Sequence, residues 1–256
     1  MLKRAIDILA ASVFLAVALP VLLFAGVLIR LDSPGPAIFC QARMGRRFRP
    51  FRLYKLRTMR IAADGPAYTL GADPRITATG RWLRRFKIDE LPQLWNVLRG
   101  DMSLVGPRPV IPELALEFDC AYRELLTVRP GLTDPASVKY CRESEILSRL
   151  DDPDAYFKTV AIPEKIRISR DYLERAGIWS DAVIVLQTFL ALASLPFSRS
   201  RNPEPAPDGR RLIQYPLAVH RGIAQKRPLH SPAALQFDGP AALRPEIDLE
   251  FGDPQR

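Results

Sequence analysis

The sequence predicts a mainly α protein with a small β-hairpin (α+β), in which an N-terminal re-entrant membrane helix hairpin precedes a cytoplasmic domain. Three observations lead to this fold class. A long apolar segment comes first, two short segments of strand character then surround a basic turn, and apolar residues afterwards recur at helical spacing. We therefore divide the chain into a membrane anchor at 1–31, a folded domain at 32–197 and a Pro-rich tail at 198–256.

The composition indicates an anionic partner and a reducing compartment. A formal net charge of +9 over 256 residues suits nucleic acid, an anionic membrane surface or a phosphorylated substrate. The three cysteines are scattered without metal-ligand spacing, as is typical of ordinary thiols. Both histidines, His220 and His230, lie in the tail, which excludes Ser-His and Cys-His catalysis from the folded domain.

The apolar segment from Ile8 to Ile29 is uncharged and long enough to span a membrane. Two features favour a re-entrant hairpin over a full span. Positive charge, which marks the cytoplasmic side, precedes the segment at Lys3 and Arg4 and follows it at Arg30 and several later arginines. Pro20 lies near its middle, where proline costs a straight helix about 3 kcal/mol. A helix that enters, breaks at Pro20 and returns satisfies both features.

The next residues predict a basic β-hairpin, with strands at 37–40 and 51–59. We expect the arginines near its turn to lie on anionic lipid headgroups. Lys55 and Arg57 lie at the other end of the second strand, so they are the candidates for contacts to a substrate phosphate. Residues 61–80 contain several Gly and Pro residues and predict a loop.

Adjacent carboxylates, Asp89 and Glu90, follow a run of cations and precede apolar residues at helical spacing. The pattern predicts a helix from Asp89 to Arg99 with Gly100 directly after its end. The positive end of a helix among cations keeps a carboxylate ionised at neutral pH and attracts phosphate. The plain structural alternative is that Asp89 caps the helix and Glu90 is a favourable first-turn residue.

A rigid loop, Gly106-Pro-Arg-Pro109, follows shortly afterwards. It holds Arg108 with little conformational freedom, as suits a guanidinium that binds phosphate in a bidentate manner. Further helices are predicted at 113–126, 143–150, 164–176 and 181–195. The last is strongly apolar and is either a core helix or one in the membrane interface. The tail from Ser198 on lacks periodicity and is predicted to be largely disordered.

Together these segments resemble the bacterial sugar transferases, the monotopic phosphoglycosyl transferases that begin glycan assembly on a polyprenyl phosphate. The similarity covers residues 1 to about 196. It rests on the apolar segment broken at Pro20, Tyr54-Lys-Leu-Arg-Thr-Met59, the block from Asp89 to Ser103, Val105-Gly-Pro-Arg-Pro109 and Arg129-Pro-Gly-Leu-Thr133.

The resemblance implies a two-step transfer of a sugar-1-phosphate from a UDP-sugar to undecaprenyl phosphate, with release of UMP. Asp89 matches the nucleophile, Glu90 the ligand of a Mg2+ cofactor, and Arg108 the phosphate-binding arginine. Lys55 and Arg57 are our own additions to this site. The resemblance also implies a catalytic domain on the cytoplasmic face of the bacterial inner membrane, anionic lipid headgroups as partners, and no nucleic acid. The sugar and the oligomeric state are left open.

Two departures from the family pattern bear on the anchor and on substrate recognition. Leu19 stands where a serine often precedes the membrane proline, and Asp134-Pro135 replaces a common Gly-Trp. Two rival functions come from other classes. One is a membrane-tethered basic adaptor that binds lipid without chemistry. The other is a metal-dependent nucleotide-sugar phosphohydrolase that uses Glu90 and Asp101 as metal ligands.

Overall fold

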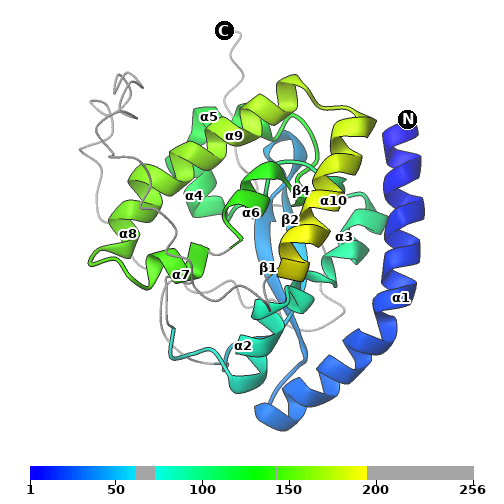
Figure 1. Ribbon diagram of the computed structural model, residues 1–256, viewed down its shortest axis with the longest axis vertical. Coiled ribbons are helices and arrows are strands. Elements are labelled where there is room, and N and C mark those ends of the chain that lie inside the picture. Colours follow the sequence, from blue (N-terminus) through cyan, green and yellow to red (C-terminus); the bar gives the residue numbers. More distant parts are fainter. Residues whose placement is uncertain (62–72, 142, 195–256) are drawn as a thin grey trace, which may run out of the picture. The chain divides into compact units, whose positions relative to one another are not determined.

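The computed structural model describes residues 1–61, 73–141 and 143–194. Within these residues helices predominate and four short strands form two separate pairs (Figure 1). The predicted mainly α fold with a small hairpin is thus confirmed, whereas the predicted tail at 198–256 lies outside the described residues. The elements are α1 Leu2–Asp32, β1 Ile38–Met44, β2 Pro50–Leu56, α2 Ala78–Arg85, α3 Gln93–Arg99, β3 Ser103–Val105, α4 Pro112–Glu117, α5 Asp119–Leu125, β4 Gly131–Thr133, α6 Pro135–Lys139, α7 Glu143–Leu147, α8 Pro153–Tyr156, α9 Ile162–Glu174 and α10 Ile178–Ser194.

The N-terminal helix α1 packs on the domain through one narrow stripe of its surface. The buried residues of this stripe are spaced by four and seven positions, and most of them are small: Asp7, Ala11, Ala18, Ala25 and Ile29. Most of the larger apolar side chains of α1 point away from the domain and are exposed. Among the described residues, α1 is the one helix long and apolar enough to cross a membrane.

The helix α1 continues through Pro20 instead of returning as a second arm. Figure 1 shows that it changes direction along its length. Pro20 provides a cause, because its ring displaces the preceding turn and it has no N–H for the helical hydrogen bond. The sequence predicted a break and a hairpin, and the structure has a single bent helix.

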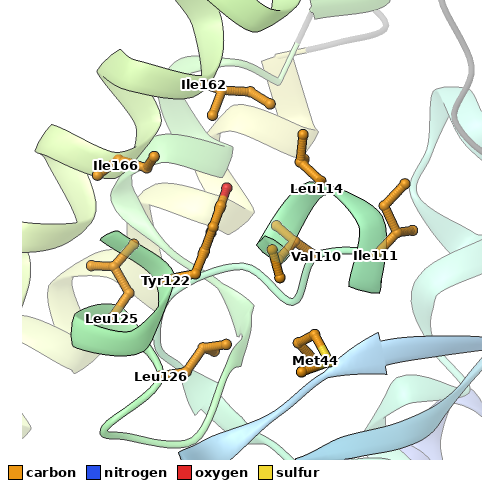
Figure 2. Packing of buried hydrophobic residues seen from close by; sticks show 10 residues of the cluster. Met44, Val110, Ile111, Leu114, Tyr122, Leu125, Leu126, Ile162 and Ile166 are labelled. Atoms are coloured by element: carbon orange, nitrogen blue, oxygen red, sulfur yellow. The ribbon is translucent and has the colours of Figure 1, made fainter. Parts of the chain in front are cut away.

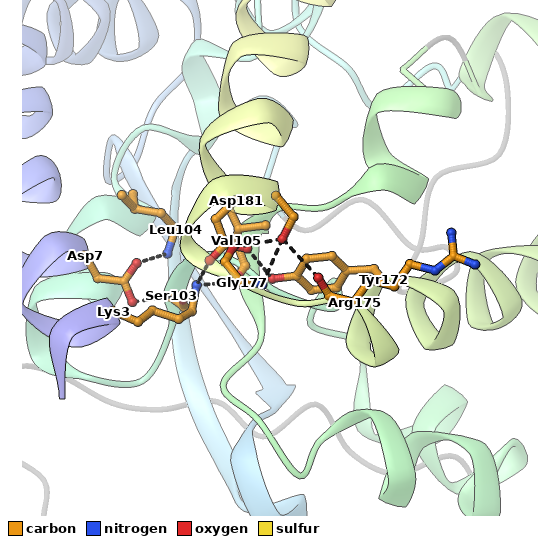
Figure 3. A network of polar contacts seen from close by, with 10 residues as sticks. Lys3, Asp7, Ser103, Leu104, Val105, Tyr172, Arg175, Gly177 and Asp181 are labelled. Atoms are coloured by element: carbon orange, nitrogen blue, oxygen red, sulfur yellow. Dashed lines mark hydrogen bonds and ion pairs between the residues drawn. The ribbon is translucent and has the colours of Figure 1, made fainter.

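Polar contacts fix the first turns of α1 to the domain (Figure 3). The carboxylate of Asp7 accepts hydrogen bonds from Ser103 Oγ at 2.8 Å and from the Leu104 N–H at 3.2 Å. Lys3 Nζ donates to the Val105 carbonyl at 3.2 Å and forms an ion pair with Asp181 at the start of α10. A carboxylate in an apolar helix thus orders the strand β3, which leads into the loop that carries Arg108.

The hairpin β1–β2 is antiparallel, with Ile38 opposite Leu56 and Met44 opposite Pro50. Because side chains alternate between the faces of a strand, Arg43, Leu53 and Lys55 share one face of the hairpin. The unpaired edge of β2 is covered by Asn96 of α3, whose Nδ2 donates to the Arg52 carbonyl at 2.7 Å and whose Oδ1 accepts from the Tyr54 N–H at 3.1 Å. This buried amide therefore holds α3 against the hairpin.

The second pair, β3 and β4, is parallel and requires two facing glycines. A Cβ added to Gly106 would lie 2.5 Å from the Arg129 carbonyl, and one added to Gly131 would lie 2.1 Å from the Gly106 nitrogen. No real side chain tolerates such approaches. Arg129 also donates from Nε to the Gly100 carbonyl at 2.7 Å, which caps the C-terminal end of α3. The Arg129-Pro-Gly-Leu-Thr133 segment therefore anchors both α3 and the loop that follows β3.

One hydrophobic core connects the turn end of the hairpin to α4, α5 and α9 (Figure 2). Met44 packs there with Val110 and Ile111, the residues that directly follow the Gly106-Pro-Arg-Pro109 loop. The Met44 N–H also donates to the Val110 carbonyl at 2.9 Å. This packing fixes the end of that loop relative to the hairpin.

Several predicted boundaries differ from the observed ones. Residues 113–126 form two helices, α4 and α5, separated at Phe118, whose backbone is not helical. The helix α2 was not predicted; it covers the end of the predicted loop at 61–80 and part of the run of cations before Asp89. Thr77 caps this helix, because its side chain accepts a hydrogen bond from the Gly80 N–H at 3.0 Å. The helix α3 ends at Gly100 as predicted, with a φ of 93°, but begins four residues later than expected.

Candidate active site

A small polar pocket of about 60 Å3 lies where the hairpin, the start of α3 and the loop after β3 meet. It brings together four of the five charged residues that the sequence singled out, and it leaves out Arg57. The lining residues are Arg43, Leu53, Lys55, Asp89, Glu90, Gln93, Arg108 and Pro109.

The two carboxylates lie on a short 3-10 turn, Ile88–Glu90, ahead of α3. Lys87 begins this turn in the left-handed conformation, with a φ of 56°. Pro92 lies between the turn and α3; it cannot donate the N–H that an earlier helix start would use. The N-cap position is Lys87 for this turn and Pro92 for α3, so the structure does not support the interpretation of Asp89 as a helix cap.

Glu90 and Arg108 form a bidentate ion pair in this pocket. Arg108 Nη2 lies 2.5 Å from Glu90 Oε1, and Nη1 lies 3.3 Å from Oε2. Burial by itself raises the pKa of Glu90, but the charges of Arg108 and Lys87 outweigh it and hold the pKa below the usual range. Glu90 therefore stays ionised at neutral pH.

The pKa of Asp89 is shifted in the opposite direction to that of Glu90. Its side chain is buried, with 7% exposed, and its Oδ1 has no hydrogen-bond partner. Burial, and then the charge of Glu90, raise the pKa of Asp89 above that of an ordinary aspartate, against the effect of nearby cations. The expectation that this environment keeps a carboxylate ionised at neutral pH thus holds for Glu90, whereas Asp89, with its pKa raised to about 6, is ionised less completely.

Lys55 faces the pocket from β2, as predicted for a residue that contacts phosphate. Burial, together with the charges of Arg43 and Arg84, lowers the pKa of Lys55 to about 8. The amine is therefore still mostly protonated at neutral pH and can neutralise an incoming anion.

The position of Arg57 does not fit the predicted phosphate contact. Its guanidinium is buried at the C-terminal end of α1, where Nη2 donates to the Ser33 carbonyl at 2.7 Å and Nη1 to the Pro34 carbonyl. Arg57 lies two positions after Lys55 and therefore just past the end of β2 at Leu56. Arg57 instead satisfies carbonyl groups that the end of a helix leaves without partners.

The sequence analysis missed Arg43 and Gln93, which also line the pocket. Arg43 was counted only among the positive charges that follow the apolar segment, but strand alternation puts it on the face of Lys55. Arg43 Nη1 donates to the Pro109 carbonyl at 3.3 Å and Nη2 to Gln41 Oε1 at 2.7 Å. Burial and the charge of Arg108 lower the pKa of Arg43 to about 10. The two-residue alternation of side chains along the strands of the hairpin is the sequence signal that could have identified Arg43.

The donor set fits Mg2+ bound jointly with a substrate. Among the described residues, no group of three or more His, Cys, Asp or Glu side chains could hold a metal ion by itself. Mg2+ commonly uses one or two carboxylates and takes its other ligands from water and phosphate. A carboxylate has about four lone-pair sites, so Glu90 can keep Arg108 and still accept a cation. Asp101 does not line the pocket. It follows the C-terminal end of α3, where its carboxylate accepts a hydrogen bond from Asn96.

A much larger apolar cavity of about 600 Å3 lies on the other face of the hairpin, against α1. Tyr54 and Leu56 line it, and these residues alternate in β2 with Leu53 and Lys55 of the polar pocket. Arg30 is the one charged residue among its lining residues, while Pro92 and Trp95 contribute from the α3 side. The hairpin thus separates a polar pocket from an apolar groove on the long apolar helix α1.

Comparison with known proteins assigns this arrangement to a family. The model of the family described as bacterial sugar transferase matches residues 1–194. A UDP-glucose:undecaprenyl-phosphate glucose-1-phosphate transferase of Caulobacter vibrioides is 41% identical over 203 residues, which cover 74% of this chain and 69% of the relative. A transferase of the same name from Escherichia coli is 34% identical over 73% of this chain and 39% of its own length. A UDP-N-acetylgalactosamine-undecaprenyl-phosphate N-acetylgalactosaminephosphotransferase of Aeromonas hydrophila is 37% identical over 73% of this chain and 42% of its own length.

Proposed function

This chain belongs to the bacterial sugar transferase family, and we propose that it transfers a sugar-1-phosphate from a UDP-sugar to undecaprenyl phosphate through a covalent aspartyl intermediate. The names of the relatives support the reaction class, since each includes undecaprenyl phosphate. Those relatives differ in the sugar that they name, so the proposal does not specify one. The product would initiate exopolysaccharide, lipopolysaccharide or glycoconjugate assembly.

In the first step the carboxylate of Asp89 attacks the β-phosphorus of the UDP-sugar. The new bond joins an Asp89 oxygen to this phosphorus, the bond from phosphorus to the bridging oxygen breaks, and UMP leaves with that oxygen. The observation that carries the proposal is the unpartnered Oδ1 of Asp89 in a pocket lined by three cations. An ionised aspartate needs no general base, which agrees with a folded domain without histidine.

In the second step a phosphate oxygen of undecaprenyl phosphate attacks the phosphorus held on Asp89. The bond to the Asp89 oxygen breaks, the carboxylate is regenerated, and the sugar leaves as an undecaprenyl-diphosphate sugar. Burial of Asp89 favours both steps, because a weakly solvated carboxylate attacks readily and its environment contains cations that stabilise charge on the phosphate.

The other residues of the pocket bind and orient charge. Arg108 is held by Glu90 with its fork fixed, so it presents a rigid donor group to a substrate phosphate. Lys55 adds a second positive charge from the hairpin. Glu90 would hold a Mg2+ ion, which would supply positive charge to neutralise the diphosphate and the departing UMP.

We also propose that α1 lies in one leaflet with both ends on the cytoplasmic side. Its first turns bond to β3 and to α3, where Arg4 donates to the Val97 carbonyl at 2.7 Å. At its other end, Asp32 accepts from the Thr79 N–H at 2.8 Å. A full span would separate the two ends by a hydrocarbon layer of about 30 Å, although both ends contact one domain. Cysteines placed at Lys3 and Arg46 should both be protected from an impermeant thiol reagent in intact cells, and labelling of one alone would contradict this topology.

The two rival functions explain less of the site. A lipid-binding adaptor requires basic surface and an apolar helix, but it gives no reason for a buried carboxylate without a partner. A phosphohydrolase with Glu90 and Asp101 as metal ligands would need both in one pocket, and Asp101 does not line it.

Intact-protein mass spectrometry tests the proposal directly. The purified protein is incubated with Mg2+ and a panel of UDP-sugars without lipid acceptor, and we expect one sugar to add the mass of a phospho-sugar that maps to Asp89. Undecaprenyl phosphate should then remove this mass and yield the lipid product. Free sugar-1-phosphate as the end product would favour the hydrolase instead, and no reaction with any of the sugars would favour the adaptor.

A further inference from the structure

Arg43 is a partly buried arginine whose Nε is buried, and among the described residues its guanidinium hydrogen-bonds to no carboxylate. In the described part of the chain, its contacts are two neutral acceptors, the Pro109 carbonyl and Gln41 Oε1. The buried Nε makes no hydrogen bond. Arg108, in contrast, has both terminal nitrogens on Glu90. Of the two arginines in the pocket, one is neutralised and the other is not.

Leaving a buried charge unpaired is costly, so such groups are usually paired or bind ligands. The same pocket also holds the unpartnered Oδ1 of Asp89. An orphan donor and an orphan acceptor in one small pocket indicate that a ligand completes the site. Since the pocket contains three cations and two carboxylates, the missing group is an anion.

The hairpin presents Arg43 and Lys55 together. Residues 41, 43, 53 and 55 all belong to one face, by the observed register and the alternation of side chains. Lys55 contributes an ammonium, and Arg43 retains an unused Nε–H. Both extend from a rigid paired strand rather than from a loop, so they form a preorganised set of donors.

We propose that Arg43 and Lys55 form a second phosphate subsite, separate from the Arg108–Glu90 pair. The inference rests on the proposed function, because it assigns the phosphate to one of that reaction's two substrates. The ligand is either a phosphate of the UDP-sugar diphosphate or the phosphate of undecaprenyl phosphate. A diphosphate beside two carboxylates needs more positive charge than Arg108 supplies, since Glu90 already neutralises Arg108.

Three variants test the subsite. Arg43→Met removes the charge and keeps the length, Arg43→Lys keeps the charge and removes the planar fork, and Arg175→Met makes the same charge change at an exposed position outside the pocket. Binding of UDP is measured by calorimetry in EDTA, so that it does not depend on a metal. The KM for undecaprenyl phosphate and the yield of phospho-sugar adduct are measured with Mg2+.

We expect Arg43→Met to weaken one phosphate interaction about 10- to 100-fold, as is typical for the loss of a charged hydrogen-bond partner. Weaker UDP binding would assign the subsite to the donor, and a raised KM for undecaprenyl phosphate with unchanged UDP binding would assign it to the acceptor lipid. Arg43→Lys should recover part of the loss, and Arg175→Met should behave like the wild type. If Arg43→Met does not fold, Arg43→Lys should still show a smaller loss of the same kind.

Two results would overturn the inference. In the first, the Arg43 variants bind UDP and undecaprenyl phosphate like the wild type. In the second, only kcat falls, which would mean that Arg43 merely positions the Pro109 carbonyl and its loop. If the proposed function itself were wrong, the wild type would form no phospho-sugar adduct. A wild type that forms the adduct, together with either of these two results, would therefore show that only the subsite assignment is wrong.

Discussion

The two faces of the β1–β2 hairpin bound two very different cavities. On one face, Leu53 and Lys55 line a polar pocket of about 60 Å3 that contains both carboxylates. On the other, Tyr54 and Leu56 line an apolar groove of about 600 Å3 against the membrane helix. Neighbouring residues of β2 thus face opposite environments. The comparison teaches that the alternation of side chains along a single strand can separate a charged pocket from an apolar groove.

The largest expected effect lies on the polar face, at Asp89. We expect Asp89→Asn to lower turnover at least about a thousandfold and to abolish the adduct, because the amide cannot attack phosphorus. Burial raises the pKa of Asp89, so the stability that it contributes is fully present below the ordinary pKa near 4 and is lost as pH rises through the raised value. At neutral pH the uncharged amide of the Asp89→Asn variant should therefore leave the melting temperature unchanged or higher.

Single-turnover assays and thermal melts measure these two effects. Asp89→Ala serves as a control against slow deamidation of the asparagine to aspartate. A fully active Asp89→Asn protein whose mass shows no deamidation would contradict the assignment of the nucleophile.

Single substitutions at two neighbouring residues of β2 compare the two faces of the hairpin directly. Lys55→Met should reduce the transfer rate about 10- to 100-fold, because it removes a buried charge from the phosphate pocket. Tyr54→Phe removes only a hydrogen bond that the exposed Arg99 donates to the hydroxyl at 3.2 Å, so it should change the rate less than about twofold. Steady-state kinetics with both substrates varied would show the difference. Equal losses from both substitutions would mean that the faces are not functionally separate.

The pH dependence of the transfer rate should reflect only the titratable groups of the polar pocket. Asp89 must be ionised, so the rate should fall as pH decreases through its raised pKa, about tenfold per unit below it. Lys55 must be protonated, so the rate should also fall as pH rises through its pKa of about 8. A rate profile between about pH 5 and pH 10 should be bell-shaped, and Lys55→Met should remove its alkaline limb. A profile that still falls in the alkaline range in Lys55→Met would assign that limb to another group.

The smallest expected effect on the rate comes from Arg57. Arg57→Met removes donors from the carbonyls of Ser33 and Pro34 at the end of α1. It should lower the free energy of unfolding by about 1–3 kcal/mol and leave UDP binding unchanged. Denaturant unfolding together with calorimetry tests both parts. A selective loss of UDP binding would restore Arg57 as a phosphate ligand.

Most of the charged residues that meet in the polar pocket could be predicted because they reside in short, contiguous motifs. Asp89 and Glu90 are neighbours, and the two prolines around Arg108 restrict its backbone. Lys55 was found because it lies within a recognisable strand. Arg57, two residues further on, was predicted wrongly because the strand ends at Leu56 and the chain then changes direction. Arg43 was missed because its pairing with β2 depends on where the turn falls.

Local sequence was enough to specify the apolar helix, the basic hairpin, the order of the motifs and the end of α3 at Gly100, since each depends on short-range spacing and on single residues such as glycine and proline. The three-dimensional packing alone established which cations reach the carboxylates and in which direction the pKa of each carboxylate shifts. Glu90 is ionised because Arg108, 18 residues away, pairs with it, whereas burial raises the pKa of its neighbour Asp89. Burial and charge pairing depend on segments far apart in the chain, and no local pattern encodes them.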